Sequence, residues 1–414
     1  MKIAVVGAGI SGLSAAYYLS KKHKVDLFEK ENQFGGHANT IKVAYNPNKE
    51  IPIDIGFMVF NKQTYPNLIN FFLENKIEIE KSDMSFSVTV ENSGLEYCGK
   101  GLGGIFSNKK NLFNPKFLKM FFEILSFYKN CEKIEIKKIS SITLGEYLTE
   151  IKISEYFINY HIIPMVSAIW SMPPYEAKQM PLSFFLSFFK NHGLFKIKDR
   201  PQWFTVTNRS KTYVDKIIGQ VSGEHFKNYN INKITRNDLG AKIFYGEENE
   251  FFEYDKVVIA THADEALKII DNPTLDEKSI LRKFKYRANT AVIHFDESVM
   301  PKNKKAWCAW NSSMDSNNNE KTAVTYWINQ LQNLKIDRNI FLTINPFKEI
   351  PNDKIFKKVA FTHPYYDTEA LTNQNNLYKI QNKKNILFCG SYFGYGFHED
   401  GIKSSIDMLK TLND

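Results

Sequence analysis

The residues that point most directly to chemistry are three glycines near the N-terminus, Gly7, Gly9 and Gly12, spaced as G-x-G-x-x-G. They follow the apolar segment 2–6, which predicts a strand, and precede a segment whose apolar pattern predicts a helix. In such a turn the first glycine permits the tight bend, the second lets the backbone approach a pyrophosphate, and the third lets helix and strand pack closely. Unpaired N–H groups at the helix N-terminus bind phosphate oxygens. The pattern therefore predicts a dinucleotide site.

An acidic residue stands where the ribose of a dinucleotide needs one. A second predicted strand, 24–28, ends directly before Glu29. The Glu29 carboxylate can accept hydrogen bonds from a ribose diol, and it would repel a 2′-phosphate. The order of strand, glycine turn, helix, strand and acid thus supports a real nucleotide site and disfavours NADP.

Two further glycine-containing segments extend this site beyond what a nicotinamide nucleotide needs. The paired Gly35 and Gly36 would let the chain cross close to a diphosphate and ribitol, which suits the longer FAD molecule. Near the other terminus, segment 385–389 predicts a strand that leads through the glycine-rich segment 390–401 into a final helix, 402–412. The positive end of that helix would stabilise the negative charge of a reduced flavin.

The composition is typical of a globular protein larger than one domain. The 414 residues exceed what one hydrophobic core usually organises, and 43% hydrophobic with 24% charged residues excludes wholesale disorder. The net charge of +9 comes without a basic-aromatic motif or a recognition helix, so we do not expect nucleic-acid binding. The four cysteines are far apart, which predicts neither a metal site nor a disulfide framework.

The N-terminus begins directly with a predicted strand, so we expect no secretion signal. No window reaches the roughly 18 apolar residues of a spanning helix. We therefore expect a protein on the cytoplasmic side, in a reducing compartment.

The motifs at both ends of the chain resemble those of the FAD-dependent flavin amine oxidase superfamily, which includes phytoene desaturases and protoporphyrinogen oxidases. Segments 35–40, 60–68, 82–87 and 396–401 resemble a bacterial subgroup of predicted NAD/FAD-binding proteins. That subgroup is often associated with cyclopropane fatty-acid synthases, and some members are implicated in oxidising methylated or methylene-bearing lipid chains. The resemblance implies an α/β protein of two domains, with a glutathione-reductase-type FAD-binding Rossmann fold and an inserted α+β substrate domain.

The resemblance also implies which residues hold the cofactor, which we expect to be non-covalent FAD. The AMP and pyrophosphate half would contact Gly7, Gly9, Ser11, Gly12, Glu29, Gly35, Gly36, His37, Ile231, Ala260 and Thr261, and the ribitol and flavin half Asp54, Gly56, Gly390, Ser391, Asp400, Gly401 and Ile402. Many relatives have an arginine on each side of the glycine pair, whereas here the flanking residues are Phe34 and His37. Diphosphate neutralisation would then depend more on the backbone and the helix dipole. The sequence contains no second G-x-G-x-x-G motif, so we expect no separate NAD(P)H site.

The predicted cofactor domain is discontinuous, with residues 1–60, 205–265 and 381–414. The substrate domain would comprise 61–204 and 266–380. Within the first of these domains, 205–265 has the pattern of alternating strands. Within the second, segments 113–128 and 181–195 are rich in phenylalanine and lysine. They are either an apolar tunnel or lipid-facing surface, or ordinary core helices with a solvated rim.

His398 and Glu399 are the candidate catalytic residues, because a base beside the flavin end would remove a proton while a hydride leaves. His398 can equally be a structural hydrogen-bonding residue. Three functions remain open. The first is an FAD-dependent oxidase or desaturase of a fatty-acyl or phospholipid chain, with peripheral contact at the inner face of the membrane. The second is an amine oxidase, and the third a non-catalytic flavoprotein that serves a lipid methyltransferase.

Overall fold

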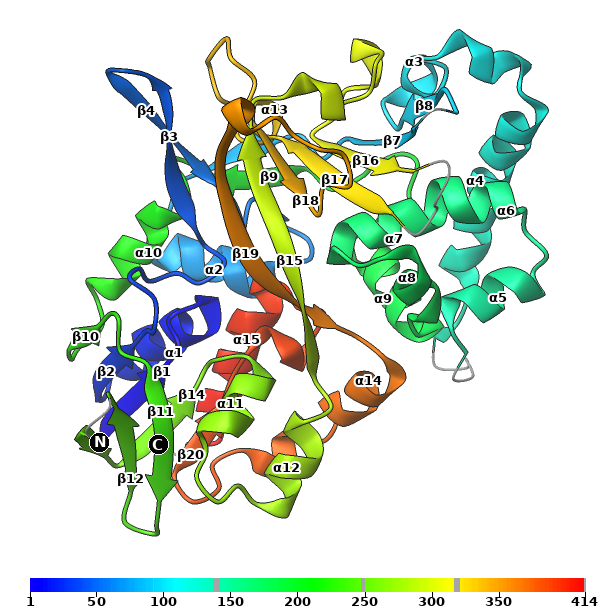
Figure 1. Ribbon diagram of the computed structural model, residues 1–414. Coiled ribbons are helices and arrows are strands. Elements are labelled where there is room, and N and C mark those ends of the chain that lie inside the picture. Colours follow the sequence, from blue (N-terminus) through cyan, green and yellow to red (C-terminus); the bar gives the residue numbers. More distant parts are fainter. Residues whose placement is uncertain (92, 137–141, 247–249, 316–320, 413–414) are drawn as a thin grey trace.

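The computed structural model describes residues 1–414 except 92, 137–141, 247–249, 316–320 and 413–414. The described strands form five sheets. Figure 1 shows the two largest in different parts of the molecule, with a five-stranded sheet in the lower part and a seven-stranded sheet in the upper part. A group of helices lies beside the larger sheet.

The five-stranded sheet is parallel throughout, in the order β10-β2-β1-β14-β20. Its strands are β1 (Lys2–Val6), β2 (Lys24–Phe28), β10 (His225–Phe226), β14 (Lys256–Ile259) and β20 (Ile386–Phe388). The central strands are buried along almost their whole length, as expected for a parallel sheet covered on both faces. Strands from the beginning, middle and end of the chain therefore share one sheet.

The first and last long helices of the chain pack against each other beside this sheet. They are α1 (Ile10–Ser20) and α15 (His398–Leu409). A Cβ added to Gly401 would lie 2.7 Å from Ser11 Oγ, so the helices approach closely only because position 401 has no side chain. One turn further along, the hydroxyls of Ser14 and Ser405 are 2.7 Å apart. The two ends of the chain are thus in direct contact.

The seven-stranded sheet is mixed, in the order β19-β15-β18-β17-β16-β7-β8, with only the β16–β7 pair parallel. Its strands are β7 (Phe86–Val90), β8 (Leu95–Cys98), β15 (Lys285–His294), β16 (Trp310–Met314), β17 (Thr322–Trp327), β18 (Phe341–Ile344) and β19 (Ile355–Tyr365). Alternate residues such as Ala291, Ile293 and Val324 bury one face against the hairpin of β3 (Thr40–Asn46) and β4 (Lys49–Asp54).

Three smaller sheets connect these parts. They consist of β3 (Thr40–Asn46) with β4 (Lys49–Asp54), β5 (Phe60–Asn61) and β6 (Ile79–Ser82) with β9 (Trp203–Val206), and β11 (Ile231–Arg236), β12 (Ala241–Tyr245) and β13 (Glu250–Tyr254) in sequence. The shorter helices are α2 (Pro66–Glu74), α3 (Gly101–Ile105), α6 (Glu155–Phe157), α10 (Lys211–Ile218), α11 (Ala263–Ile269), α12 (Leu275–Leu281), α13 (Ile328–Leu331) and α14 (Thr368–Gln374).

The helical group beside the mixed sheet has an aromatic core of its own. Its main helices are α4 (Pro115–Lys133), α5 (Leu144–Glu150), α7 (Ile163–Trp170), α8 (Pro174–Gln179) and α9 (Leu182–Asn191). On α9 the phenylalanines are buried, so this segment is a core helix. On α4 the pattern is amphipathic, because Phe117 is buried while Phe122 is 65% exposed. None of the helices in the described ranges is long and apolar enough to cross a bilayer.

Two sequence-based boundaries are wrong. The alternating strands predicted across 205–265 are interrupted by α10, because Tyr213, Val214 and Ile217 bury one helical face there. The last helix begins at His398 rather than at 402, because the Asp400 carboxylate accepts the Phe397 N–H at 2.9 Å and caps an additional turn.

Candidate cofactor site

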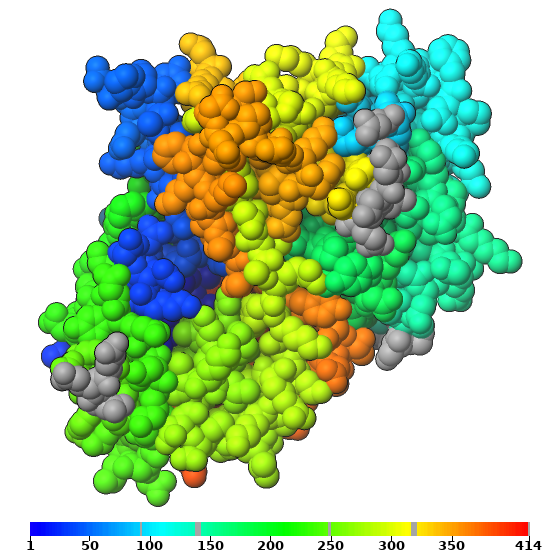
Figure 2. Space-filling model, viewed as in Figure 1, coloured from blue at the N-terminus to red at the C-terminus, as the bar shows by residue number. Residues whose placement is uncertain are grey.

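The N-terminus of α1 lacks a side-chain cap. Its N-cap residue, Gly9, has an extended backbone, and no side chain among the described residues caps the helix there. The first N–H groups of a helix have no intrahelical partner. A Cβ added to Gly9 would meet no atom within 4 Å, so these donors border open space. Figure 2 shows a hollow between the blue N-terminal residues, the orange β19 and the yellow-green segment that contains α11 and the start of β15. This arrangement suits a phosphate.

The other two glycines of the motif are packed tightly against backbone. A Cβ on Gly12 would lie 1.8 Å from Gly7 O, and a Cβ on Gly7 would lie 2.9 Å from Ala260 O and 3.2 Å from Thr261 N. Gly7 also has a φ of +99°, which favours glycine. The structure therefore brings Gly7, Gly12, Ala260 and Thr261 together below the open space at Gly9.

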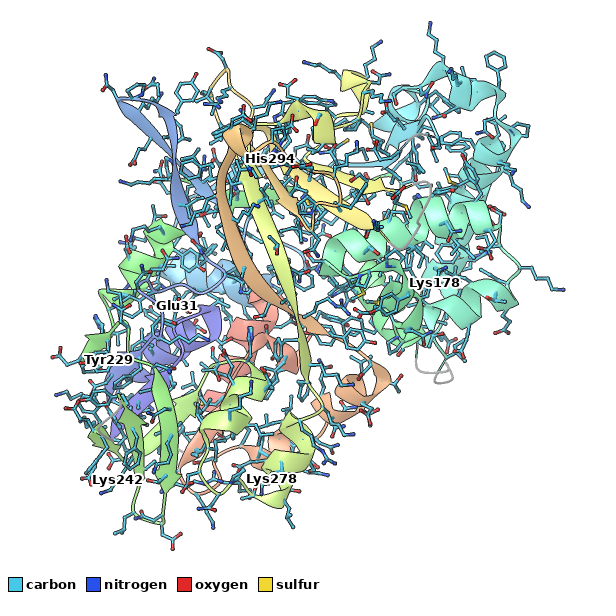
Figure 3. All side chains as sticks on the ribbon, viewed as in Figure 1. Glu31, Lys178, Tyr229, Lys242, Lys278 and His294 are labelled. Carbon is cyan, nitrogen blue, oxygen red and sulfur yellow. The ribbon has the colours of Figure 1, made fainter. Side chains whose placement is uncertain are left out.

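Glu29 is buried at the end of β2. Its carboxylate accepts the N–H groups of Ala8 (2.9 Å) and Glu31 (3.0 Å), and burial is the main cause that raises its pKa. The N–H of Tyr229 donates to Glu29 O at 3.0 Å. In Figure 3, Glu31 and Tyr229 lie on the same side of the molecule. The chain leading into β11, which starts at Ile231, therefore lies beside the predicted ribose site.

Gly35 and Gly36 cross directly over the first glycine turn. The Gly35 N–H donates to Ala8 O at 2.9 Å, and a Cβ on Gly36 would lie 3.0 Å from Gly9 Cα. Next to them, the O atom of His37 accepts the Phe57 N–H at 2.6 Å and would lie 2.3 Å from a Cβ on Gly56. Burial lowers the pKa of His37 to about 3, so it does not replace a missing arginine as a cation.

The Asp54 carboxylate is engaged with protein donors. It accepts the N–H of Ser210 at 2.9 Å and the hydroxyls of Ser210 and Thr40, both at 2.6 Å. Ser210 is the N-cap residue of α10, so Asp54 links β3, β4 and that helix. Contact between Asp54 and a ribitol stays a prediction.

The C-terminal candidates surround the start of α15. The Gly390 N–H donates to Ser404 Oγ at 2.9 Å, and Ser391 follows it in a short 3₁₀ helix. Ile402 is fully buried. Burial raises the pKa of Asp400 to about 7 and raises that of Cys389. Because Gly401 contacts Ser11, the first turn of α15 lies directly beside the first turn of α1.

The candidate catalytic pair makes contacts typical of structural residues. His398 stacks on Phe57, with ring centroids 3.6 Å apart, and its Nε2 lies 3.2 Å from the Tyr213 hydroxyl. Burial lowers its pKa well below the usual value. Glu399 accepts hydrogen bonds from Asn67 N (3.0 Å), Asn67 Nδ2 (2.6 Å) and Leu68 N (2.9 Å), which lie in the first turn of α2. Their catalytic role stays a prediction.

An aromatic wall adjoins the segment 394–397. Phe184 of α9 packs on Tyr366 (4.7 Å between centroids) and on Tyr395 (5.1 Å), while Phe188 stacks on Phe397 (5.2 Å). The buried Tyr366 hydroxyl lacks a hydrogen-bond partner among the described residues and would lie 2.8 Å from a Cβ on Gly396. A buried donor of this kind is available to a bound group.

The sequence did not reveal Tyr366 or His363, whose ring lies 5.4 Å from that of His37. Both belong to the region of β19, far from any glycine motif. The only available signal is the alternation of Phe361 and His363, which places both side chains on the face that meets His37.

Comparison with known proteins supports the nucleotide-binding turn near the N-terminus. Residues 5–74 match the family model described as an NAD(P)-binding Rossmann-like domain. Prenylcysteine oxidase 1 of Rattus norvegicus is 56% identical over 46 residues, and the 4,4′-diapophytoene desaturase of Staphylococcus aureus (strain Newman) is 54% identical over 43 residues. Each match covers 10% of this chain and only 9% of the relative.

Solved structures match over the whole chain. The CLA-producing fatty acid isomerase from P. acnes superposes with a TM-score of 0.69 at 12% identity, covering 99% of this chain and 98% of that one. Cyclohexylamine oxidase from Brevibacterium oxydans IH-35A superposes with a TM-score of 0.69 at 15% identity, covering 100% and 99%. The predicted α/β fold, a Rossmann-type nucleotide-binding part with a mixed-sheet second part, is therefore confirmed. The fatty acid isomerase and the cyclohexylamine oxidase share this fold.

Proposed function

We propose that the protein is an FAD-dependent oxidoreductase that takes a hydride from an apolar fatty-acyl or phospholipid chain. The observation that carries the proposal is the glycine cradle, in which the uncapped N-terminus of α1 borders open space at Gly9 and Gly36 crosses above it. A diphosphate fits this cradle because the donors and the space are already present. The contact of Gly401 with Ser11 brings the C-terminal glycine-rich segment beside this cradle, and a second contact surface of this kind suits the longer FAD molecule better than a shorter nucleotide.

Bound FAD supplies the two-electron acceptor for a substrate hydride. The N–H groups of α1 and the glycine pair would hold its diphosphate, Glu29 would accept the ribose hydroxyls, and the positive end of α15 would face the ring. The aromatic wall around Tyr366 would exclude water from the ring end. Cys389 precedes the C-terminal glycine-rich segment, and burial raises the pKa of its thiol, which makes it a poor nucleophile; we infer that the cofactor is bound non-covalently.

An acyl chain is favoured over an amine by the apolar surroundings of the segment 394–397, where Phe184, Phe188 and Tyr366 pack. Two similar proteins are named for apolar molecules, a fatty acid isomerase and a diapophytoene desaturase, whereas others are named for amines. The amine oxidase therefore remains the second candidate. A non-catalytic role beside a lipid methyltransferase, and membership of the subgroup linked to cyclopropane synthases, rest on sequence resemblance alone.

Contact with the membrane surface forms part of the proposal. Leu102, Leu112, Phe113 and Phe122 are 68%, 46%, 85% and 65% exposed around the start of α4. Lys109 and Lys110 lie in the same turn as Leu112 and Phe113, and Lys116 follows. Exposed apolar side chains beside lysines suit an anionic lipid surface, which would present the substrate at the cytoplasmic face.

The test is anaerobic titration of the purified yellow protein. We expect fatty-acyl lipid to bleach the oxidised flavin while alkylamines leave it unchanged. Bleaching by an amine alone would favour the second candidate, and bleaching by neither would favour the non-catalytic role. With substrate in anionic vesicles, Phe113→Ser/Phe122→Ser should slow bleaching. The control Leu239→Ser/Leu275→Ser should not, because its side chains, 91% and 87% exposed, lie elsewhere on the surface. Equal slowing in both variants would contradict membrane contact.

The substitution Glu399→Ala distinguishes two roles of this carboxylate, as a hydrogen-bond acceptor for the first turn of α2 and as a catalytic base. Loss of three charge-assisted hydrogen bonds at the start of α2 is expected to lower the free energy of unfolding by about 2 kcal/mol. The rate of flavin reduction in the remaining folded protein should stay within about twofold, whereas loss of a general base costs roughly 10²-fold or more. Urea denaturation and stopped-flow absorbance measure the two quantities. Glu50→Ala, at an exposed surface pair, is the control and should change neither.

A further inference from the structure

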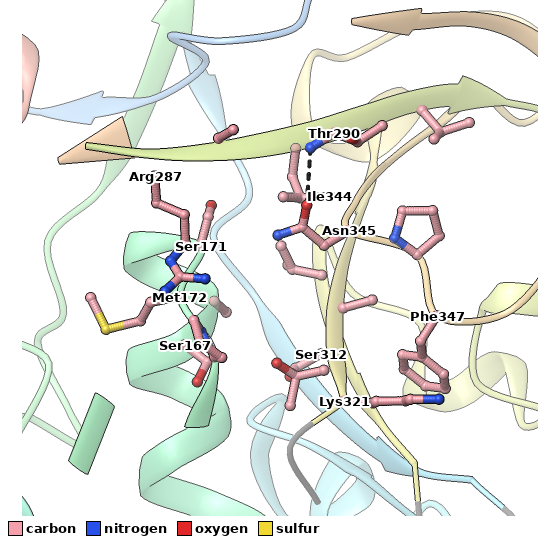
Figure 4. Close-up of a pocket in the computed structure, with 18 of the residues that line it drawn as sticks. Ser167, Ser171, Met172, Arg287, Thr290, Ser312, Lys321, Ile344, Asn345 and Phe347 are labelled. Atoms are coloured by element: carbon pink, nitrogen blue, oxygen red, sulfur yellow. Dashed lines mark hydrogen bonds between the residues drawn. The ribbon is translucent and has the colours of Figure 1, made fainter. Parts of the chain in front are cut away.

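A cavity of 620 Å³ lies between α7 and the seven-stranded sheet. Figure 4 shows Ser167, Ser171 and Met172 on the helix side, with Thr290 of β15 across from them and the Arg287 side chain reaching from β15 toward Met172. Its volume is within the range of about 300–1,000 Å³ that ligand sites occupy. Part of the lining is apolar, with Ala168, Met172, Val292, Val324, Ile344 and Phe347.

The charged residues of the lining are all cations. Arg287, Lys321 and Lys358 line the cavity, and no aspartate or glutamate is among the lining residues that the structure describes. Arg287 is ion-paired with Glu176, which lies outside the lining. Lys321 and Lys358 are exposed at the edge of the cavity, and neither charge is offset by a carboxylate among the described residues. A cavity with this charge attracts anions and repels ammonium groups.

A buried donor in the cavity also lacks a partner. Ser167 is only 4% exposed, lines the cavity from α7, and its hydroxyl has no hydrogen-bond partner in the described part of the chain. Buried hydroxyls are normally satisfied, so an unsatisfied one that borders a cavity indicates a position for a ligand acceptor.

The cavity wall is connected to the candidate cofactor site. Asn345, in the lining, accepts the Thr290 N–H at 2.9 Å and donates to Asn289 Oδ1 at 2.6 Å. Asn289 Nδ2 lies 3.0 Å from His363 Nδ1, and the His363 ring lies 5.4 Å from that of His37, which follows the glycine pair. The strands β15 and β19 therefore separate the cavity from the cofactor site by only a few side chains.

We propose that this cavity binds the anionic end of the substrate lipid, a carboxylate or a phosphate, with Lys321, Lys358 and Ser167 as its donors. The proposal rests on the proposed function and narrows it to acyl lipids that carry a negative charge. The apolar part of the lining contacts the first carbons of the chain. An amine substrate, by contrast, would place like charges together, which costs binding energy.

The test is isothermal titration of the FAD-loaded protein, below the critical micelle concentration, with four probes of matched chain. Oleate and oleoyl lysophosphatidate carry the two anionic groups, methyl oleate is neutral, and oleylamine is cationic. We expect at least one anionic probe to bind roughly tenfold tighter than the neutral and cationic probes. Whichever anion binds more tightly identifies carboxylate or phosphate as the source.

Lys321→Gln/Lys358→Gln should abolish that preference. The control Lys335→Gln/Lys357→Gln removes the same charge from exposed positions outside the cavity and should keep it. Ser167→Ala breaks no described hydrogen bond, so it should fold normally and weaken anion binding about threefold. A preference that persists in the first variant, or equal binding of methyl oleate, would overturn the proposal. If anions bind as expected but bleach no flavin, the site stands and the proposed function fails.

Discussion

Replacing Gly9 with valine is expected to give a stably folded protein that does not bind FAD and is therefore colourless. Gly9 has an extended backbone, which any residue adopts, and a Cβ there would meet no protein atom within 4 Å. The valine side chain would instead fill the space that a diphosphate needs beside the uncapped N-terminus of α1. The melting temperature of the apoprotein should remain close to that of the parent, while FAD no longer raises it.

Gly12→Ala is the matched comparison, because it changes the same motif but should reduce the stability of the fold rather than block the cofactor. Its Cβ would lie 1.8 Å from Gly7 O, a backbone atom, so β1 and α1 would have to separate. We expect the free energy of unfolding to fall by about 3 kcal/mol or more, with or without FAD. Thermal unfolding and titration of FAD fluorescence measure both effects. Full yellow absorbance in Gly9→Val would show that the diphosphate lies elsewhere.

The nucleotide-binding part of the fold was predictable because its signals are local. A buried strand, a glycine turn and an acid follow one another within residues 2–29, and each glycine acts through its backbone. Backbone requirements of this kind leave a direct trace in the sequence. The motifs at the two ends predicted that both serve one cofactor, and the direct contact of α1 with α15 at Gly401 is what the structure adds.

The roles of acidic side chains were harder to predict, because the donors that a carboxylate accepts hydrogen bonds from depend on which residues the fold places beside it. Asp54 and Glu399 each lie beside a glycine motif, yet their oxygens meet Ser210 and Asn67, which are distant in the sequence. The phenylalanine-rich segments posed the same difficulty. Composition could not distinguish the buried rings of α9 from the exposed Phe122 on α4, since only the packing of the helical group decides which face is covered.

Asp54→Ala is expected to lower the free energy of unfolding by about 3 kcal/mol. The substitution leaves the Ser210 N–H and the hydroxyls of Ser210 and Thr40 without their acceptor, in a position where Asp54 is 1% exposed. It therefore loosens the link between α10 and the β3–β4 hairpin. If stability were unchanged while FAD affinity fell, the carboxylate would serve the cofactor instead, as the sequence predicts.

Asp54→Asn provides the matched control and a pH dependence. Its amide oxygen still accepts one bond, and hydroxyl groups can rotate to accept from its NH₂ group, so we expect a loss of only about 1 kcal/mol. Burial raises the pKa of Asp54 above its usual value, although the Ser210 and Thr40 donors oppose this. The folded protein therefore holds that proton more tightly than the unfolded chain does, and the parent loses stability as pH rises from about 4 through the raised pKa. Asparagine does not titrate, so the stability difference between parent and variant should shrink as pH rises. Urea denaturation of both proteins between about pH 4 and pH 8 measures it, and a difference that grows with pH would show that the site favours the carboxylate.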